Sequence, residues 1–281
     1  MPEIHPSAVV DPKAQLADDV QIGPFCYVGP KVTLGSGTHL TSHVSVVGRT
    51  TLGENNTVWA NAAIGGDPQD LKFTGEDSAV VIGDHNEIRE GVTIHKGTAN
   101  DHGVTKLGHH NMIMAYTHVA HDCVLGSNII VANSVQFAGH CHVEDHVVIG
   151  GLSAIHHLTT LGRFSFIGGM TRVVHDVPPC MILEGNPSTV RGLNLIGLRR
   201  RGFTDESIHH LKDAFRRLFG ARVRRSTVNN THATLQDLED AYPHDPHITE
   251  LIAFMRRSES GVHGRYLESQ RKDNRWTNKA R

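Results

Sequence analysis

Residues 107–172 read LGHHNM IMAYTH VAHDCV LGSNII VANSVQ FAGHCH VEDHVV IGGLSA IHHLTT LGRFSF IGGMTR when they are divided into groups of six. Every group opens with a hydrophobic residue, and all of these are Leu, Ile or Val except Phe137. A similar series begins at Ile4 and places Ile, Val or Leu at every sixth position as far as Ile64. Because hydrophobic periodicity is the primary signal of secondary structure, the chain is interpreted as a hexapeptide repeat.

The residues around each repeat position predict short strands. Glycine often follows the hydrophobic residue, and the position four residues after it is usually small or β-branched. Such stretches punctuated by glycine are typical of strands joined by tight corners. One hexapeptide cannot bury its own hydrophobic side chain, so the repeats are expected to stack around a shared interior.

This hexapeptide pattern resembles the left-handed parallel β-helix family, in which three hexapeptides form one triangular coil. The resemblance alone implies the left-handedness, because crossover connections are ordinarily right-handed. We therefore predict a mainly β fold with a β-helix of about ten coils over residues 1–186, interrupted by loops at 66–81 and 97–106. Residues 187–281 are expected to form a small α-helical C-terminal domain with a polar, frayed tail.

Composition narrows the class of protein. The chain has 281 residues and a formal net charge of −2, so a nucleic-acid partner is not expected. Residues 1–186 carry 9 basic and 18 acidic side chains, whereas residues 187–281 carry 18 basic and 11 acidic ones, which suggests two regions with different partners. The N-terminus lacks a secretory signal pattern and no long apolar run occurs, so a cytoplasmic location without stable membrane insertion is expected. The four cysteines have no CxxC spacing and predict neither a zinc ribbon nor a disulfide framework.

Residues 18 positions apart should lie one above another in such a coil. His121, Gly139 and His157 form one such column, outside the inward repeat positions. Three further histidines adjoin it: His118, His140 and His156. A neutral imidazole can accept a proton near pH 7, and the Gly139 N–H is available to stabilise an oxyanion. A column on a flat prism has no pocket of its own, so the site is expected between subunits of a homo-oligomer.

Longer motifs resemble one family within this fold class. They are His118–Cys123, Phe137–His140, Ile149–Gly151 followed by His156, Pro68–Lys72, Ile88–His95, and Gly192–Asn194 leading to Leu198–Phe203. At these positions the chain is similar to the UDP-N-acetylglucosamine O-acyltransferases of lipid A biosynthesis, which belong to the hexapeptide-repeat acyltransferases. The resemblance implies a metal-free, cofactor-free homotrimer that transfers a 3-hydroxyacyl chain from acyl carrier protein to the 3-hydroxyl of UDP-N-acetylglucosamine, the first step of lipid A biosynthesis.

The resemblance also implies roles for individual residues. His121 would act as the general base, Asp122 would orient it, and the Gly139 N–H would stabilise the oxyanion of a direct attack on the thioester. Positions that match contacts to the sugar or the acyl chain are Asp70, Lys72, His95, His118, His140 and His156, and His157 is a further candidate for substrate binding. Positions that match contacts near the nucleotide and its phosphates are Gln69, Asn194, Arg200 and Arg201.

Two positions depart from the pattern of the family, and both bear on substrate recognition. His157 stands where the family commonly has Gln, and Ile196 stands where it has an acidic residue. Two alternative functions stay open at the level of sequence. One is an N-acyltransferase that acts on the 3-amino sugar. The other is a metal-dependent lyase like the gamma-class carbonic anhydrases, β-helix trimers that hold zinc with interfacial histidines.

Overall fold

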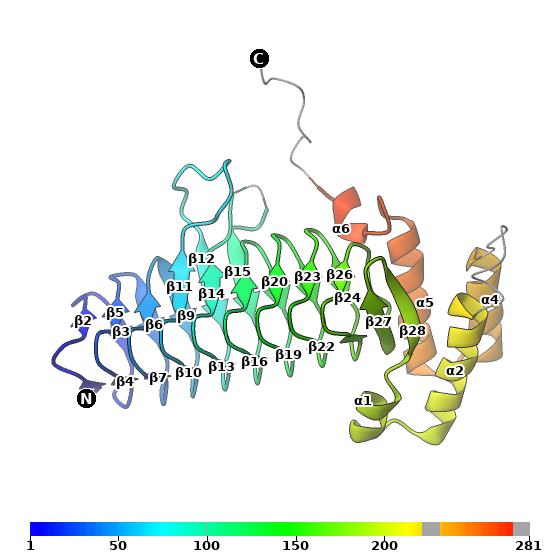
Figure 1. Ribbon diagram of the computed structural model, residues 1–281, viewed down its shortest axis with the longest axis horizontal. Helices are drawn as coiled ribbons and strands as arrows, with labels where there is room; N and C mark the ends of the chain where they lie inside the picture. Colours follow the sequence, from blue (N-terminus) through cyan, green and yellow to red (C-terminus); the bar gives the residue numbers. More distant parts are fainter. Residues whose placement is uncertain (100, 221–230, 272–281) are drawn as a thin grey trace, which may run out of the picture.

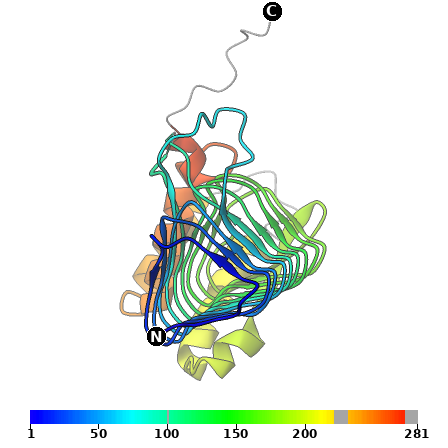
Figure 2. The ribbon, with the colours of Figure 1, turned by 90° about the vertical axis from the view of Figure 1, so that its left-hand side faces the viewer.

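The structure is a computed structural model that describes residues 1–99, 101–220 and 231–271. Stacked coils form a three-sided prism, and a group of helices lies at its C-terminal end (Figure 1, Figure 2). Two loops project from one edge of the prism. The predicted fold class, a left-handed parallel β-helix followed by a small α-helical C-terminal region, is confirmed.

Each face of the prism is one sheet, and we name the three faces sheets A, B and C. Sheet A contains, in order, β1 (Glu3–Ile4), β4 (Gln21–Ile22), β7 (His39–Leu40), β10 (Thr57–Val58), β13 (Glu87–Ile88), β16 (Met112–Ile113), β19 (Ile130–Val131), β22 (Val148–Ile149), β25 (Phe166–Ile167), β27 (Met181–Gly185) and β28 (Ser188–Leu193). Sheet B contains β2 (Val9–Val10), β5 (Tyr27–Val28), β8 (Ser45–Val46), β11 (Ala63–Gly66), β14 (Thr93–His95), β17 (His118–Val119), β20 (Gln136–Phe137), β23 (Ala154–Ile155) and β26 (Arg172–Val173). Sheet C contains β3 (Gln15–Leu16), β6 (Val32–Leu34), β9 (Arg49–Leu52), β12 (Ala79–Ile82), β15 (Val104–Leu107), β18 (Val124–Leu125), β21 (His142–Val143) and β24 (Thr160–Leu161).

The register of the parallel strands confirms that residues 18 positions apart are stacked. Val119 in β17 pairs with Phe137 in β20. Where a loop is inserted the step is longer, and Thr93 in β14 pairs with His118, which follows it by 25 residues. The inserted loops therefore leave the ladder of strands continuous.

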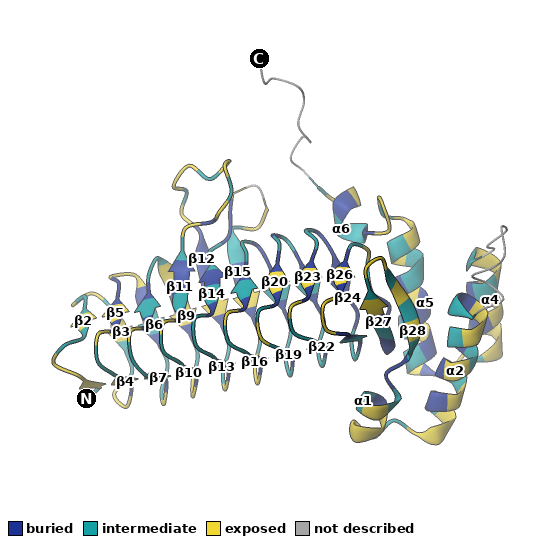
Figure 3. Cartoon of the chain, in the orientation of Figure 1, coloured by how far each residue is buried: buried dark blue, intermediate teal, exposed yellow. Residues whose placement is uncertain are grey.

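The repeat positions fill the interior of the prism. Val119, Val131 and Val143, which open their hexapeptides, are 0% exposed. The position four residues later is buried as well, and it holds the free thiols of Cys123 and Cys141. Figure 3 shows exposed residues on the first coils, on the projecting loops and on the outer faces of the C-terminal helices. The core is therefore a narrow column of aliphatic side chains.

The two inserted loops are shorter than the sequence predicted. Loops were expected at 66–81 and 97–106, but β12 begins at Ala79 and β15 begins at Val104. These strands pair with each other from Ala79 and Val104 to Ile82 and Leu107. Because this pairing extends both strands backward, the projecting segments are residues 67–78 and 96–103.

The C-terminal region begins with a hairpin. β27 continues sheet A by pairing with β25, and it pairs antiparallel with β28 across the expected domain boundary at residue 186. The helices that follow are α1 (Leu195–Arg200), α2 (Asp205–Phe219), α4 (Thr231–Ala241), α5 (Pro246–Glu259) and α6 (Tyr266–Ser269). Side chains of Thr204 and Asp245 cap the N-termini of α2 and α5. None of the helices in the described part of the chain is long and apolar enough to span a bilayer.

The polar segment after α5 is packed against the prism as far as residue 271, whereas the sequence led us to expect a frayed tail. Arg265 and Glu268 are 7% and 6% exposed, and their charged groups lie 3.2 Å apart. Arg265 also donates a hydrogen bond to the carbonyl of Val174 at 2.7 Å. Paired charges and a backbone contact thus order a stretch that has no apolar periodicity. The rest of the expected tail, residues 272–281, lies outside the described residues.

Candidate functional site

His121 lies at the corner between sheets B and C, in the turn that joins β17 to β18. The next residue, Asp122, has a φ of 59°, a left-handed conformation that aspartate adopts more readily than most residues. Asp122 Oδ2 lies 3.0 Å from His121 Nδ1. The corner of a single hexapeptide thus builds a histidine–carboxylate pair from two adjacent residues.

The Asp122 carboxylate is buried and held by several hydrogen bonds. It accepts one from the Thr98 N–H at 2.9 Å and one from the Thr98 hydroxyl at 2.6 Å. Burial by itself would raise the pKa of Asp122, but hydrogen bonds from His121 and Thr98 outweigh burial and leave that pKa below its usual value. The ionised carboxylate favours the tautomer of His121 that carries a proton on Nδ1 and a lone pair on Nε2. Such a ring can accept a proton at Nε2.

Gly139 lies one coil beyond His121, where a larger residue would not fit. A Cβ built on Gly139 would lie 2.5 Å from His121 Cε1 and 2.7 Å from His121 Nε2. Among the described residues, none accepts a hydrogen bond from the Gly139 N–H. Glycine therefore leaves room for the imidazole and offers an unused backbone donor beside it.

His140 packs its ring edge-on against His121. The ring centroids are 5.0 Å apart at an interplanar angle of 89°. His140 Nδ1 lies 2.8 Å from Asp101 Oδ2, and His102 Nδ1 lies 2.9 Å from the other oxygen of the same carboxylate. Hydrogen bonds from His102 and His140 hold the pKa of Asp101 well below its usual value. A second ionised carboxylate therefore orients the histidine next to the first pair.

Two more histidines lie on the sheet B side of the corner. His95 and His118 are edge to face with ring centroids 4.8 Å apart, and His118 Nδ1 lies 2.7 Å from the Thr93 hydroxyl. Burial, and then the proximity of His95, lowers the pKa of His118 to about 4. Burial also lowers the pKa of His95, whose Nδ1 is buried with no hydrogen-bond partner in the described residues. At pH 7 both rings are neutral and offer hydrogen-bonding groups without charge.

His156 and His157 continue the column in the following coil. Their ring centroids are 4.1 Å apart, and His157 Nε2 lies 3.4 Å from Glu268 Oε2. Burial, and then the proximity of His156, lowers the pKa of His157 to about 4. His157, one of the two departures noted in the sequence, is therefore in contact with the C-terminal segment.

The other predicted residues lie on two separate parts of the chain. The projecting loop at residues 67–78 carries Gln69, Asp70 and Lys72. Helix α1 and its two cap positions carry Asn194, Arg200 and Arg201. Figure 1 shows this loop and α1 on opposite sides of the prism. Within one chain, the structure joins the histidines to Asp122 and Gly139 but does not bring the residues of α1 to them.

Two groups of side chains at this corner are close enough together to hold a cation. Ligand atoms of His121, Asp122 and His140 lie within 4.8 Å of one another, as do those of Asp101, His102 and Asp122. Hydrogen bonds account for these short distances, such as 3.0 Å between His121 and Asp122 and 2.9 Å between Asp101 and His102. The clusters are thus explained without an ion, and the expectation of a metal-free reaction stays a prediction.

Sequence reasoning missed three residues of this site: Thr98, Asp101 and Glu268. The first two lie in the inserted loop at residues 96–103, and the third lies in the polar C-terminal segment. Neither segment follows the repeat, so its position in space could not be counted from the period. The available signal was the insertion itself, because a loop that interrupts a regular repeat is usually functional.

Comparisons with known proteins point to one family. The sequence model of a family described as "Udp N-acetylglucosamine O-acyltransferase; Domain 2" matches residues 176–263. The chain is 44% identical to the acyl-[acyl-carrier-protein]–UDP-N-acetylglucosamine O-acyltransferase of Stutzerimonas stutzeri, over 85% of this chain and 92% of that protein. It is 42% identical to the protein of the same name from Sinorhizobium fredii, over 90% of this chain and 92% of that protein. A solved structure of LpxA from Acinetobacter baumannii matches with a TM-score of 0.84 and 41% identity, over 89% of this chain and 95% of that one.

Proposed function

The chain belongs to the UDP-N-acetylglucosamine O-acyltransferases, and from that premise we propose that it transfers a 3-hydroxyacyl chain from acyl carrier protein to the 3-hydroxyl of UDP-N-acetylglucosamine. This reaction is the first step of lipid A biosynthesis. The observation that carries the mechanism is the His121–Asp122 pair packed against Gly139. The relatives are named as O-acyltransferases, so neither N-acyl transfer nor a metal-dependent lyase is favoured.

His121 acts as the general base in this mechanism. Its Nε2 takes the proton from the sugar hydroxyl as the hydroxyl oxygen attacks the thioester carbonyl carbon. Negative charge develops on the carbonyl oxygen, where the free Gly139 N–H stabilises it. The C–S bond then breaks, and the leaving thiolate takes the proton from the His121 imidazolium. The products are the sugar ester and the free thiol of the carrier protein, and His121 is neutral again.

Asp122 positions the base and stabilises its charged form. Its ionised carboxylate keeps the proton of neutral His121 on Nδ1 and offsets the positive charge of the imidazolium. A covalent acyl-enzyme is not part of the mechanism. The thiols of Cys123 and Cys141 are buried in the prism, and burial raises the pKa of Cys141, so neither is suited to act as a nucleophile.

The other site residues are proposed to bind the substrates. Contacts to the sugar and the acyl chain are assigned to Asp70, Lys72, His95, His118, His140, His156 and His157. Contacts to the nucleotide and its phosphates are assigned to Gln69, Asn194, Arg200 and Arg201. Arginine suits phosphate because its planar guanidinium can donate two parallel hydrogen bonds. Because α1 lies away from His121 within one chain, α1 of a second copy is required to complete the site (Figure 1).

The reaction is tested directly with purified protein, UDP-N-acetylglucosamine and a panel of 3-hydroxyacyl carrier proteins of different chain lengths. We expect an acylated UDP-sugar whose acyl group is released by mild base, as an ester is and an amide is not. Failure to acylate the sugar with every donor would reject the proposed function. We propose a cytoplasmic location for this protein.

A homotrimer is proposed as the assembly that completes the site. At the corner between sheets A and B, which we call the ridge, several coils expose a large apolar side chain. Tyr116, Leu152 and Met170 in this ridge are 69%, 65% and 74% exposed. Large apolar side chains exposed along one edge are typical of a surface that another protein covers. A second copy that packs on this ridge would exclude it from water.

The double substitution Leu152→Glu and Met170→Glu is expected to break the trimer into monomers, because it places carboxylates in the buried contact. Analytical ultracentrifugation at micromolar concentration measures the change. Val81→Glu is the matched control, since Val81 is 41% exposed but lies on sheet C, and it should stay trimeric. A monomeric wild-type protein would contradict the trimer, and a trimeric double variant would contradict this interface.

A further inference from the structure

The C-terminal segment from residue 260 to residue 271, which we call the C-terminal strap, lies against the last coils of the prism. The family sequence model ends at residue 263, so most of the strap lies beyond the matched region. His175 Nδ1 lies 2.8 Å from the carbonyl of His263, and the Asp176 N–H donates to the carbonyl of Gly264 at 2.8 Å. The Tyr266 N–H donates to Asp176 Oδ2 at 2.8 Å. Backbone contacts thus tie the strap to the prism.

Buried charges hold the strap in place as well. The Glu268 side chain is 2% exposed and lies between three cationic or polar partners. Its carboxylate lies 3.2 Å from Arg265, 3.4 Å from His157 and 3.6 Å from Arg271. Separating such buried groups would leave uncompensated charges, which is strongly unfavourable. The strap is therefore a fixed part of the site's surroundings.

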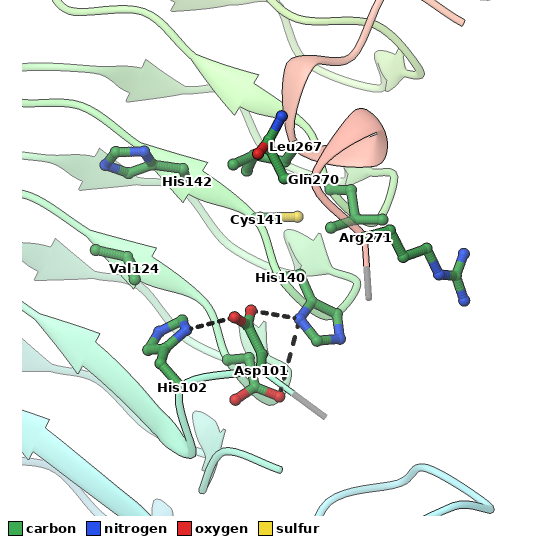
Figure 4. A pocket seen from close by; sticks show the side chains of 11 residues that line it. Asp101, His102, Val124, His140, Cys141, His142, Leu267, Gln270 and Arg271 are labelled. Carbon is green, nitrogen blue, oxygen red and sulfur yellow. Dashed lines mark hydrogen bonds and ion pairs between the residues drawn. The ribbon is translucent and has the colours of Figure 1, made fainter. Parts of the chain in front are cut away.

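A cavity of about 230 Å³ lies between the strap and the prism, on the sheet C side of the corner. Its apolar lining residues are Val124, Cys141, Leu158 and Leu267. At one end it reaches Asp122 and His140, the neighbours of the catalytic base. Figure 4 shows His140 at this end, beside Asp101. Its rim is polar and includes His102, Gln270 and Arg271. An apolar cavity of about 150 Å³ is enough for a benzene molecule, so this one can take a stretch of a flexible chain.

Two flexible chains leave the thioester that reacts beside His121: the acyl chain and the pantetheinyl arm of the carrier protein. The acyl chain beyond its hydroxyl is purely apolar. The arm alternates short apolar stretches with two amides and ends in a phosphate. The cavity has an apolar floor, an amide from Gln270 at its rim and a guanidinium from Arg271. The order of these groups, from apolar floor to amide to guanidinium, matches the order of groups along the arm. A hydrocarbon chain would make no hydrogen bond with the polar rim.

We propose that the cavity beneath the C-terminal strap binds the pantetheinyl arm of the acyl donor, an inference that rests on the proposed function. The arm enters past Arg271 and Gln270 and lies against Leu267, and its sulfur end reaches the corner that holds Asp122 and His140. His95 and His118 lie on the sheet B side of the same corner, so the sugar and the arm approach the base from different faces. The strap is then a specificity element for the donor.

Leu267→Trp tests the proposal, because the larger ring fills the cavity. Free phosphopantetheine, titrated by calorimetry, is the probe, so that binding is measured without turnover. We expect the variant to bind the probe at least about tenfold more weakly than wild type. The matched control is Val262→Ala, which shortens an exposed side chain of the strap that does not line the cavity and should bind as wild type does. Gln270→Ala, which removes only an exposed amide, is expected to weaken binding without affecting the fold.

Steady-state kinetics provide the second readout. The donor KM of Leu267→Trp should rise by a similar factor, while the KM for UDP-N-acetylglucosamine and the preference among acyl chain lengths stay unchanged. Equal probe affinity in Leu267→Trp and wild type would overturn the proposal, and so would a changed chain-length preference, which would assign the cavity to the acyl chain. Probe binding without any acyl transfer by wild type would instead reject the proposed function and leave the cavity assignment standing.

Discussion

His121→Ala is expected to lower kcat by about 10²–10⁴-fold, the range that a general base contributes. The side chain is 13% exposed and lies outside the hydrophobic interior, so its removal leaves the stacked core intact. Without the ring, no group is positioned to take the proton of the attacking hydroxyl. The Gly139 N–H and the substrate contacts remain. The loss should therefore appear in kcat, with little change in the KM of either substrate.

The measurement is initial-rate acyl transfer at saturating concentrations of both substrates, with circular dichroism to show that the variant is folded. His85→Ala is the matched control because His85 is also a histidine at a corner of the prism, but it lies between sheets C and A, away from the proposed contact between copies. It should retain the wild-type kcat. A loss smaller than tenfold for His121→Ala would contradict its assignment as the base.

The geometry around His121 could be predicted because the repeat turns sequence spacing into position. Counting 18 residues from His121 gives Gly139, and the structure brings the two close enough for a Cβ on Gly139 to collide with the imidazole. The same count explains why Val119 and Phe137 share the core. Each strand places one hydrophobic residue of the repeat in the interior. A shift of register would move that residue out of the core, so the strict period fixes the register.

Position could not be predicted where the period is broken. His95 lies beside His118 although 23 residues separate them in sequence, because the inserted loop lengthens that coil. Asp101 lies within the same loop, and its contact with His140 depends on how the loop folds back. Glu268 is further away still, since it reaches His157 through a segment that looks unstructured in sequence. Each of these contacts is made by polar groups that carry no periodic signal.

The histidine column and the nucleotide contacts were predicted on different grounds. Stacking alone predicted the histidine column, but it gave no role to Asn194. In the structure Asn194 accepts a hydrogen bond from the Gly197 N–H at 3.1 Å and caps α1. Its proposed nucleotide contact rests on the family and on a second copy of the chain. Asn194 can thus cap α1 within its own chain and also belong to a binding site that only a second copy of the chain completes.

Gly139→Ala is expected to lower kcat by about 10²-fold, although it adds a single methyl group. The new Cβ would lie 2.5 Å from His121 Cε1, whereas ordinary contacts are 3.4–4 Å, so the imidazole must shift by roughly 1 Å. A displacement of that size at a reacting group can cost about 10²-fold. The backbone N–H of residue 139 is retained, so the loss reports the displaced base and not a missing oxyanion donor.

Gly29→Ala is the control that separates this effect from a general intolerance of alanine at corners. Gly29 follows a strand as Gly139 does, but a Cβ there would meet its nearest atom, Val47 Cα, at 3.5 Å. That distance is an ordinary van der Waals contact, and the variant should keep the wild-type kcat. If Gly139→Ala also stays within threefold of the wild-type kcat while remaining folded, the close packing of Gly139 against His121 is not required for catalysis. Alanine also supplies the backbone N–H of residue 139, so in that case neither the packing nor the oxyanion donor would require a glycine, and His121→Ala would become the single decisive measurement of the base.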